Sequence, residues 1–121
     1  MNEPVLGRPD AEPGPQIDTF PVEAPVQLVR FHSTELTALC PVTEQPDFYT
    51  IEIGYTPVDR CIESKSLKLY LRTFSDAGIF AEHLAPRIAD HLSAAVGTPV
   101  TVTLEQGVRG GITTTVSATS S

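Results

Sequence analysis

The chain has 121 residues, of which 40% are hydrophobic, and it carries a formal net charge of −7. This length and hydrophobic content are typical of one globular domain, and a core of this size gains from association of subunits. Proteins that bind nucleic acid usually present a basic surface, so the acidic balance argues against a nucleic-acid partner. The sequence has no apolar run near the roughly 20 residues that span a bilayer and no signal-peptide pattern, which predicts a cytoplasmic protein without a membrane partner.

The N-terminal segment differs in composition from the rest of the chain. Residues 1–22 contain five prolines and several acids, and such a composition cannot build a packed core. We therefore expect residues 1–22 to form a flexible tail and residues 23–121 to form a single folded domain.

Strand patterns precede the helices. A first strand is predicted over residues 25–32, and a loop that contains Cys40 and two prolines is predicted over residues 36–46. Residues 48–56 give a stronger strand pattern, because large apolar side chains alternate there with smaller or polar ones. The residues predicted on its buried face are Tyr49, Ile51, Ile53 and Tyr55.

The periodicity then changes to that of amphipathic helices. The first apolar stripe at helical spacing consists of Leu67, Tyr70, Leu71 and Phe74. The basic residues on another face of this helix are Lys65, Lys68 and Arg72. The apolar stripe of a second helix consists of Leu84, Ile88, Leu92 and Ala95. Pro86 is compatible with this second helix only within its first turn, and Gly97 is predicted as its C-terminal stop.

Two further strands complete the predicted fold. Val100, Val102 and Leu104 alternate with threonines, and a similar pattern follows over residues 112–116, after the glycines of residues 107–111. The predicted order is ββααββ, which is typical of an α+β fold with a four-stranded antiparallel sheet and two helices on one face. A sheet this small would gain by pairing its exposed edges with neighbouring subunits.

Four short segments carry a family resemblance. Residues 40–48 read CPVTEQPDF, residues 63–70 read ESKSLKLY, residues 80–82 read FAE and residues 109–111 read RGG. In this order and spacing they resemble the nitrile reductase family of queuosine biosynthesis, the QueF family, in its short single-module form. The second segment matches the signature octapeptide of that family at every position.

The resemblance implies a fold, an assembly and an activity. The fold is the tunnelling fold, in which subunits of a homo-oligomer form rings, their sheets join into a barrel and active sites lie between subunits. The activity is the reduction of the nitrile of 7-cyano-7-deazaguanine to an aminomethyl group with two NADPH. The substrate is a free base, so an acidic net charge is compatible with it.

The resemblance assigns the reacting groups to Cys40 and Asp47. A thiolate adds readily to the carbon of a nitrile, so Cys40 is expected to form a covalent thioimide. Asp47 is expected to accept the thiol proton and to return a proton to nitrogen. Without the resemblance, Cys40 would be read as a buried apolar thiol and Asp47 as a turn residue. The cysteines and histidines lack the spacing of zinc ligands, so no metal site is predicted.

The resemblance also assigns binding residues. Those expected to contact the substrate are Glu82, Glu63 and Ser64. Those expected to contact NADPH are Lys65, Ser66 and Lys68. A carboxylate can accept two parallel hydrogen bonds from the ring, and clustered cations can hold the phosphates. The alternative for the basic residues is an ordinary solvated helix face.

One departure from the family pattern and two alternative functions stay open. Ala81 stands where the family has a histidine, and His83, on the other side of Glu82, would point nearly the opposite way on a helix. This puts a proton role of that histidine in doubt, although not the covalent step.

The alternative functions are a family member that adds ammonia to the nitrile in tRNA, and a non-catalytic purine- or pterin-binding module of the same fold.

Overall fold

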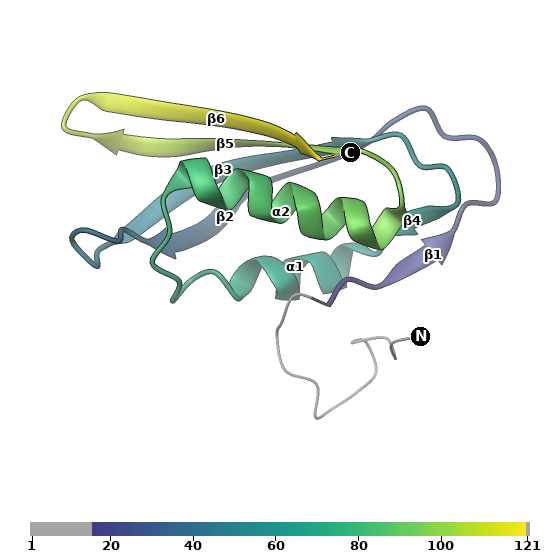
Figure 1. Cartoon of the computed structure of the whole chain (residues 1–121), viewed down its shortest axis with the longest axis horizontal. Coiled ribbons are helices and arrows are strands. Elements are labelled where there is room, and N and C mark those ends of the chain that lie inside the picture. The colour runs from purple at the N-terminus through teal and green to yellow at the C-terminus, as the bar shows by residue number, and fades with distance from the viewer. Residues whose placement is uncertain (1–15, 121) are drawn as a thin grey trace.

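A computed structural model describes residues 16–120 (Figure 1). Its strands are β1 (Thr19–Pro21), β2 (Val29–Leu39), β3 (Pro46–Tyr55), β4 (Arg60–Ile62), β5 (Val100–Arg109) and β6 (Ile112–Ser120). Its helices are α1 (Ser64–Arg72) and α2 (Ala81–Val96). Within the described range, neither helix is long and apolar enough to cross a membrane.

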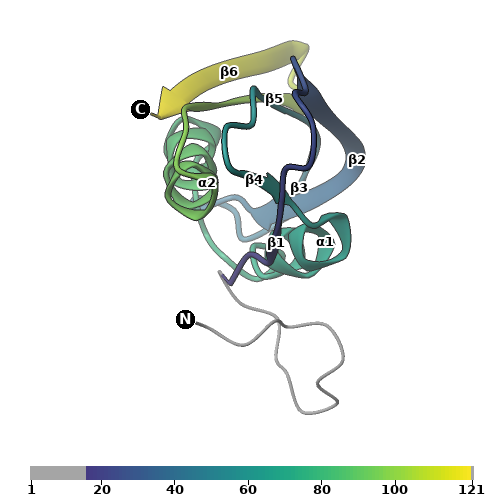
Figure 2. The same ribbon diagram turned by 90° about the vertical axis from the view of Figure 1, so that its right-hand side faces the viewer.

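The main sheet is antiparallel and has the strand order β2-β3-β5-β6. Figure 2 shows that this sheet curves around α1 and α2, which cover one of its faces. The predicted α+β class, with a four-stranded antiparallel sheet and two helices on one face, is therefore confirmed. The short strands β1 and β4 were not predicted and pair with each other in a second sheet, so the full order is ββββααββ.

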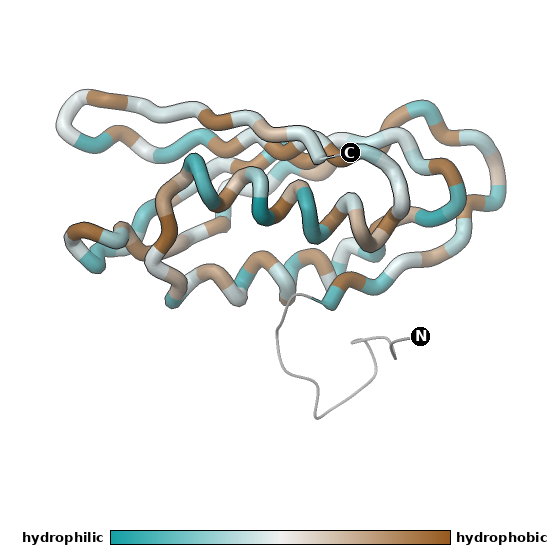
Figure 3. The backbone as a smooth tube through the Cα atoms, in the orientation of Figure 1, coloured by the Kyte–Doolittle hydropathy of each residue, from teal (hydrophilic) through white to brown (hydrophobic). Residues whose placement is uncertain are grey.

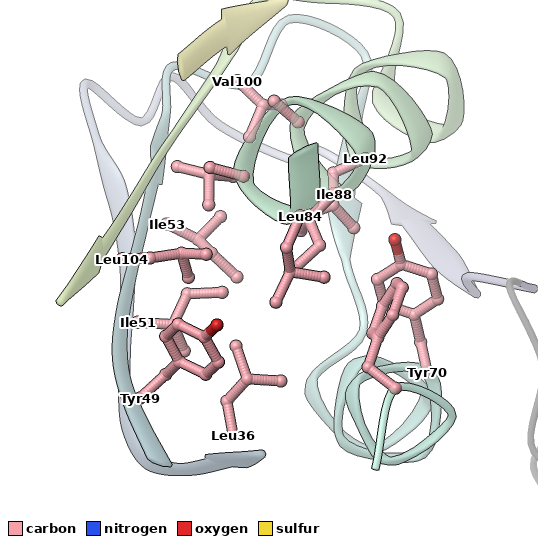
Figure 4. Close-up of a cluster of buried hydrophobic side chains, with 14 of the residues drawn as sticks. Leu36, Tyr49, Ile51, Ile53, Tyr70, Leu84, Ile88, Leu92, Val100 and Leu104 are labelled. Carbon is pink, nitrogen blue, oxygen red and sulfur yellow. The ribbon is translucent and has the colours of Figure 1, made fainter. Parts of the chain in front are cut away.

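The core lies between the main sheet and the helices (Figure 4). The sheet contributes Tyr49, Ile51, Ile53 and Tyr55 from β3 and Val100, Val102 and Leu104 from β5. The second helix contributes Leu84, Ile88 and Leu92. Full burial of such a side chain stabilises a fold by roughly 1.5–3 kcal/mol. The alternation and the helical spacing in the sequence therefore predict the correct buried faces of these elements.

The first long strand extends beyond its predicted range. β2 continues to Leu39 through part of the segment predicted as a loop, and its last pair with β3 is Leu39 with Pro46. Its register shifts between Ser33 and Leu36, so the buried positions change phase within the strand. The prediction of a loop from residue 36 was wrong because a bulge of this kind interrupts the alternation that indicates a strand.

Helix α2 ends as predicted but contains its proline in an unexpected place. Gly97 has a φ of 73° and donates its N–H to the carbonyl of Ser93, which ends the helix. Pro86 is the sixth residue of α2 and so lies beyond the first turn, contrary to the prediction. Since proline has no N–H, it cannot bond to the carbonyl of Glu82 four residues earlier. The N-terminal part of α2 therefore lacks one backbone hydrogen bond of a regular helix.

Strand β1 lies before residue 23, where the folded domain was predicted to begin. Thr19–Pro21 pairs with Arg60–Ile62 of β4, and the Glu63 N–H donates to the carbonyl of Asp18 at 2.9 Å. The expectation of a flexible tail over residues 1–22 is therefore wrong for this stretch, and the folded part begins before residue 23. Residues 1–15 of the predicted tail lie outside the described residues.

Candidate active site

Cys40 lies in a tight loop between β2 and β3. The Cys40 N–H donates to the carbonyl of Gln45, and the Glu44 N–H donates to the carbonyl of Cys40, both at 2.8 Å. Glu44 closes the loop in the left-handed region, with a φ of 60°. Because both ends of the loop are bonded to each other, the cysteine is held at a fixed point beyond the end of the sheet.

The same loop activates the thiol. The Thr43 hydroxyl contributes most to lowering the pKa of Cys40 from 9.0 to about 7. The backbone amides of Thr43 and Val42 act in the same direction, and so does the positive charge of Arg109, whereas partial burial opposes them. A thiolate is the nucleophilic form of cysteine, so near neutral pH a large share of Cys40 is ready to react.

Asp47 and Arg109 form a partly buried ion pair beside this loop. Asp47, on β3, is 3% exposed and shares the inner face of the strand with Tyr49. The Arg109 guanidinium at the end of β5 donates to the Asp47 carboxylate. The turn that follows Arg109 is made by Gly110 and Gly111, with φ values of 58° and 80° that glycine adopts readily. Arg109 supplies the opposite charge that a buried carboxylate requires, and the RGG segment was its signal in the sequence.

Glu82 is brought to the same end of the molecule by backbone hydrogen bonds. The Leu39 N–H donates to the carbonyl of Ala77 at 2.9 Å, and the Ile79 N–H donates to the carbonyl of Leu39 at 3.1 Å. Helix α2 begins two residues after Ile79, and Glu82 is exposed in its first turn. The strand that leads into Cys40 is therefore attached directly to the segment that leads into Glu82.

Tyr49 is a residue that sequence reasoning placed in the core and not in the site. Its side chain is 2% exposed, and burial raises its pKa, with further contributions from the negative charges of Glu82 and Cys40. Its ring lies on the helix side of the sheet, between Leu36 and Ile51 (Figure 4). Residues 16–120 supply no hydrogen-bond partner for its hydroxyl oxygen.

The start of α1 uses two predicted binding residues for its own structure. The Glu63 carboxylate caps the helix, accepting from the N–H of Lys65 at 3.0 Å and of Ser66 at 2.7 Å. Ser66 is fully buried, and its hydroxyl accepts from the Asp18 N–H and donates to the Glu63 carbonyl, both at 2.9 Å. The Ser66 hydroxyl therefore uses both of its hydrogen bonds within the fold, and the structure offers no support from this side chain for the predicted contact with a cofactor. The structure gives Glu63 a capping role that the prediction did not include.

A cavity of about 550 Å³ lies between α1 and the edge strand β2. Lys68, Arg72 and Ser64 line it from the helix, and His32 lines it from the strand. Lys65 is exposed on α1 but is not among the lining residues. Two cations beside a cavity of this size suit the phosphates of a dinucleotide such as NADPH, so Lys68 and Arg72 are the residues that fit that role.

The elements that carry the predicted site residues lie at two opposite ends of the folded molecule. Figure 1 shows the β2–β3 loop, the start of α2 and the end of β5 at one end, and the start of α1 at the other, beside β1 and β4. Within one chain the fold therefore brings Cys40, Asp47 and Glu82 to the same end. It does not bring Glu63 and Ser64 to them.

The two residues that flank Glu82 point in different directions, as the helical spacing predicts. Ala81 is buried in the core, whereas His83 is exposed. The His83 ring meets the ring of Phe80 edge-on, with centroids 6.2 Å apart. His83 is therefore turned toward the segment before the helix and does not replace a side chain at position 81.

A nucleophilic cysteine, a buried carboxylate–arginine pair and an exposed carboxylate at a helix start, on an α+β scaffold, define a site suited to covalent cysteine catalysis. The family described as QueF-like protein matches residues 46–121, and the chain belongs to this family. A relative from Frankia casuarinae is 47% identical over 94% of this chain and 92% of its own length. A second, from Anaeromyxobacter dehalogenans, is 44% identical over 88% of this chain and 90% of its own length. Both are named NADPH-dependent 7-cyano-7-deazaguanine reductase.

The fold is also found in a solved structure. The archaeosine synthase QueF-Like, in its apo form, matches with a TM-score of 0.75, covering 80% of this chain and 96% of that one. The two sequences are 23% identical, so the likeness is one of fold.

Proposed function

We propose that this chain reduces the nitrile of 7-cyano-7-deazaguanine to an aminomethyl group with NADPH, acting on the free base in the cytoplasm. Relatives that bear this activity in their names match 88–94% of the chain at 43–47% identity. The structural observation that carries the proposal is the Cys40 loop. It provides a thiol with a pKa of about 7 at the same end of the fold as Asp47 and Glu82.

Cys40 is the proposed nucleophile. Its thiolate sulfur forms a bond to the nitrile carbon, one π bond of the nitrile breaks, and the nitrogen takes up a proton, which gives a thioimide. Asp47 is proposed to pass this proton, because its carboxylate lies beside the Cys40 loop. Arg109 compensates the charge of Asp47 and keeps the carboxylate in one position.

Glu82 is proposed to hold the ring of the substrate. A carboxylate accepts two parallel hydrogen bonds from an N–H edge such as that of deazaguanine. Glu82 is exposed in the first turn of α2, where the helix dipole favours a negative charge. The substrate ring would therefore extend from Glu82 toward Cys40.

Lys68 and Arg72 are proposed to hold the phosphates of NADPH in the cavity beside α1. NADPH supplies the hydride, and conversion of a nitrile to an amine takes four electrons, so two NADPH are consumed. Lys65, which the sequence placed in this group, lies outside the cavity lining and is expected to contribute little.

A second copy of the chain is proposed to complete each site, in a ring whose sheets join into a barrel. The start of α1, which contains Ser64, and the β2–β3 loop, which contains Cys40, lie at different ends of the folded chain, so two copies would be needed to bring these residues together. Large apolar side chains are exposed at both ends of the folded chain. Figure 3 shows brown, hydrophobic stretches of the backbone tube in both regions. The exposed side chains are Val42, Phe48, Phe80, Val108 and Ile112 at one end and Phe20, Val26, Leu28 and Val58 at the other. Contacts between ends would bury these side chains.

The proposed activity is tested by following NADPH oxidation with and without 7-cyano-7-deazaguanine, together with the mass of the product. Nitrile-dependent oxidation at two NADPH per amine, abolished in Cys40→Ala, is the expected result. A mass adduct on Cys40 without NADPH oxidation would refute the reductase and favour the family branch that adds ammonia. The absence of both signals would refute any chemistry at Cys40.

The shared site is tested by mixing two inactive variants. Cys40→Ala removes the nucleophile, and Ser64→Trp places a bulky side chain at the exposed start of α1. If each site draws on two chains, dissociation and reassembly of the mixture restores part of the activity, because some sites receive neither substitution. Failure of the mixed rings to regain activity would contradict a site that draws Cys40 and Ser64 from two different chains.

A further inference from the structure

The Tyr49 hydroxyl is an exception in an otherwise well-bonded core. Tyr55, on the same face of β3, accepts a hydrogen bond from the Ile62 N–H at 2.7 Å, and the Tyr70 hydroxyl pairs with His91 Nδ1 at 2.7 Å. Tyr49 is as buried as these residues, yet its oxygen has no partner within residues 16–120. Burial of an unpaired hydroxyl costs free energy, and a phenylalanine would fill the same space without that cost.

The position of Tyr49 relates this exception to the active site. Tyr49 is two residues after Asp47 on the same face of β3. It therefore lies near the start of this strand, close to the Cys40 loop. Figure 4 shows its oxygen pointing away from the strand, toward the helix layer. The charges of both Cys40 and Glu82 act on this hydroxyl, so it lies within electrostatic reach of the two groups that would hold a ligand at its ends.

The hydroxyl is a donor in this environment. Burial and the two negative charges raise the pKa of Tyr49 above its ordinary value, so the phenol keeps its proton at neutral pH. A protonated phenol beside anionic groups offers an O–H to an acceptor on a bound molecule. The acceptor must lie between the part of the ligand that contacts Glu82 and the part that contacts Cys40.

We propose that the Tyr49 hydroxyl donates a hydrogen bond to the ring carbonyl oxygen of the bound deazaguanine. If Glu82 accepts from the N–H edge and Cys40 attacks the nitrile carbon, as in the proposed function on which this inference rests, the carbonyl is the acceptor on the ring edge between them. Tyr49 is then a third point of contact, which fixes the rotation of the ring in its plane and so aims the nitrile carbon at the sulfur.

The test compares Tyr49→Phe with Tyr55→Phe, each in the Cys40→Ala background so that binding of 7-cyano-7-deazaguanine is reversible. Calorimetry without NADPH gives the Kd, and denaturant unfolding without ligand gives the stability. Tyr49→Phe should weaken binding about tenfold, since one hydrogen bond to the ligand is lost, and should leave the stability equal or higher. Tyr55→Phe should lower the stability, because Ile62 loses its acceptor, and should leave the Kd unchanged.

Several outcomes would overturn the inference. An unchanged Kd in Tyr49→Phe would do so, and so would a loss of stability as large as that of Tyr55→Phe, since the hydroxyl would then be a structural group. Absence of binding by the Cys40→Ala protein with Tyr49 intact would also overturn it. Failure of the proposed function is distinct, because it shows as a lack of nitrile-dependent NADPH oxidation in the unmodified protein, whereas the Kd ratio is measured without NADPH.

Discussion

Replacement of Thr43 by valine should raise the pKa of Cys40 without altering the fold of its loop. Valine has nearly the shape of threonine but lacks the hydroxyl, which contributes most to the lowered pKa of Cys40. The same hydroxyl oxygen also accepts from the Gln45 N–H at 3.3 Å, a long bond at an exposed position whose loss costs little. The backbone amides of Thr43 and Val42 remain in place, so part of the effect on the pKa survives.

The size of the effect follows from the thiolate fraction. With a pKa of about 7, roughly half of Cys40 is thiolate at pH 7. If the substitution restores half of the difference between about 7 and 9.0, that fraction falls to about one tenth. Because only the thiolate reacts, alkylation of Cys40 at pH 7 should slow about fivefold. The rate should rise with pH in both proteins and reach its half-maximum at a higher pH in Thr43→Val.

The assay is the rate of iodoacetamide addition to Cys40 across a pH series, read by peptide mass so that the buried Cys61 does not interfere. The midpoint of the profile is the decisive quantity, because it does not depend on the intrinsic nucleophilicity of the thiolate. Thr43→Ser keeps a hydroxyl and serves as the matched control, with a midpoint near that of the unmodified chain. Identical midpoints in Thr43→Val and Thr43→Ser would refute the role assigned to the hydroxyl.

Three further substitutions separate structural from functional roles. Ser66→Ala should lower the free energy of unfolding by about 1–2 kcal/mol, because two hydrogen bonds of a buried hydroxyl are lost, and should leave the KM for NADPH unchanged; a raised KM would restore the cofactor role. Arg109→Leu should destabilise by about 1–3 kcal/mol in denaturant, less than a fully buried pair because Arg109 is partly exposed, and Asp47→Asn in the same chain should recover part of the loss. Lys68→Ala should raise the KM for NADPH severalfold in steady-state kinetics, and equal effects in Lys65→Ala would contradict the cavity assignment.

The sequence predicted correctly the elements in which the spacing of apolar residues matches the spacing of buried residues. β3 and β5 show strict alternation, and their buried positions agree with it from Tyr49 to Tyr55 and from Val100 to Leu104. The stop of α2 at Gly97 was also predictable, because a left-handed cap favours glycine wherever it occurs. In these cases local chemistry and tertiary packing lead to the same structure.

The parts that were missed depend on contacts between distant residues. β1 and β4 are three residues each and exist because they pair with one another across about 40 positions, which no local pattern reveals. The bulge in β2 changes the phase of a strand after Ser33 and so conceals the part that leads into Cys40. Ser66 sits inside a motif that resembles a binding segment, and only its burial shows that the hydroxyl serves the fold.

The candidate site shows the same division. Cys40, Asp47 and Glu82 could be named from the resemblance of short segments, and the fold brings them to one end of the chain. The roles of the groups that set their chemistry could not be predicted, although the RGG segment did single out Arg109. The Thr43 hydroxyl, the Arg109 partner and the unpaired Tyr49 oxygen acquire their roles from where the loop and the two strands end.

The two backbone bonds of Leu39 have a consequence for selectivity. They join the strand that ends at Cys40 to the segment that begins α2, so the span between Cys40 and Glu82 is set by main-chain atoms. Side chains can adjust to a ligand by changing rotamer, whereas a span of this kind cannot lengthen without breaking both bonds. If Cys40 and Glu82 hold the two ends of one ligand, as proposed, this backbone span limits the length of heterocycle that the site accepts. Only the reach of the two side chains can then adjust the fit, so a much longer ring system would collide with one end and a much shorter one would lose contact with the other.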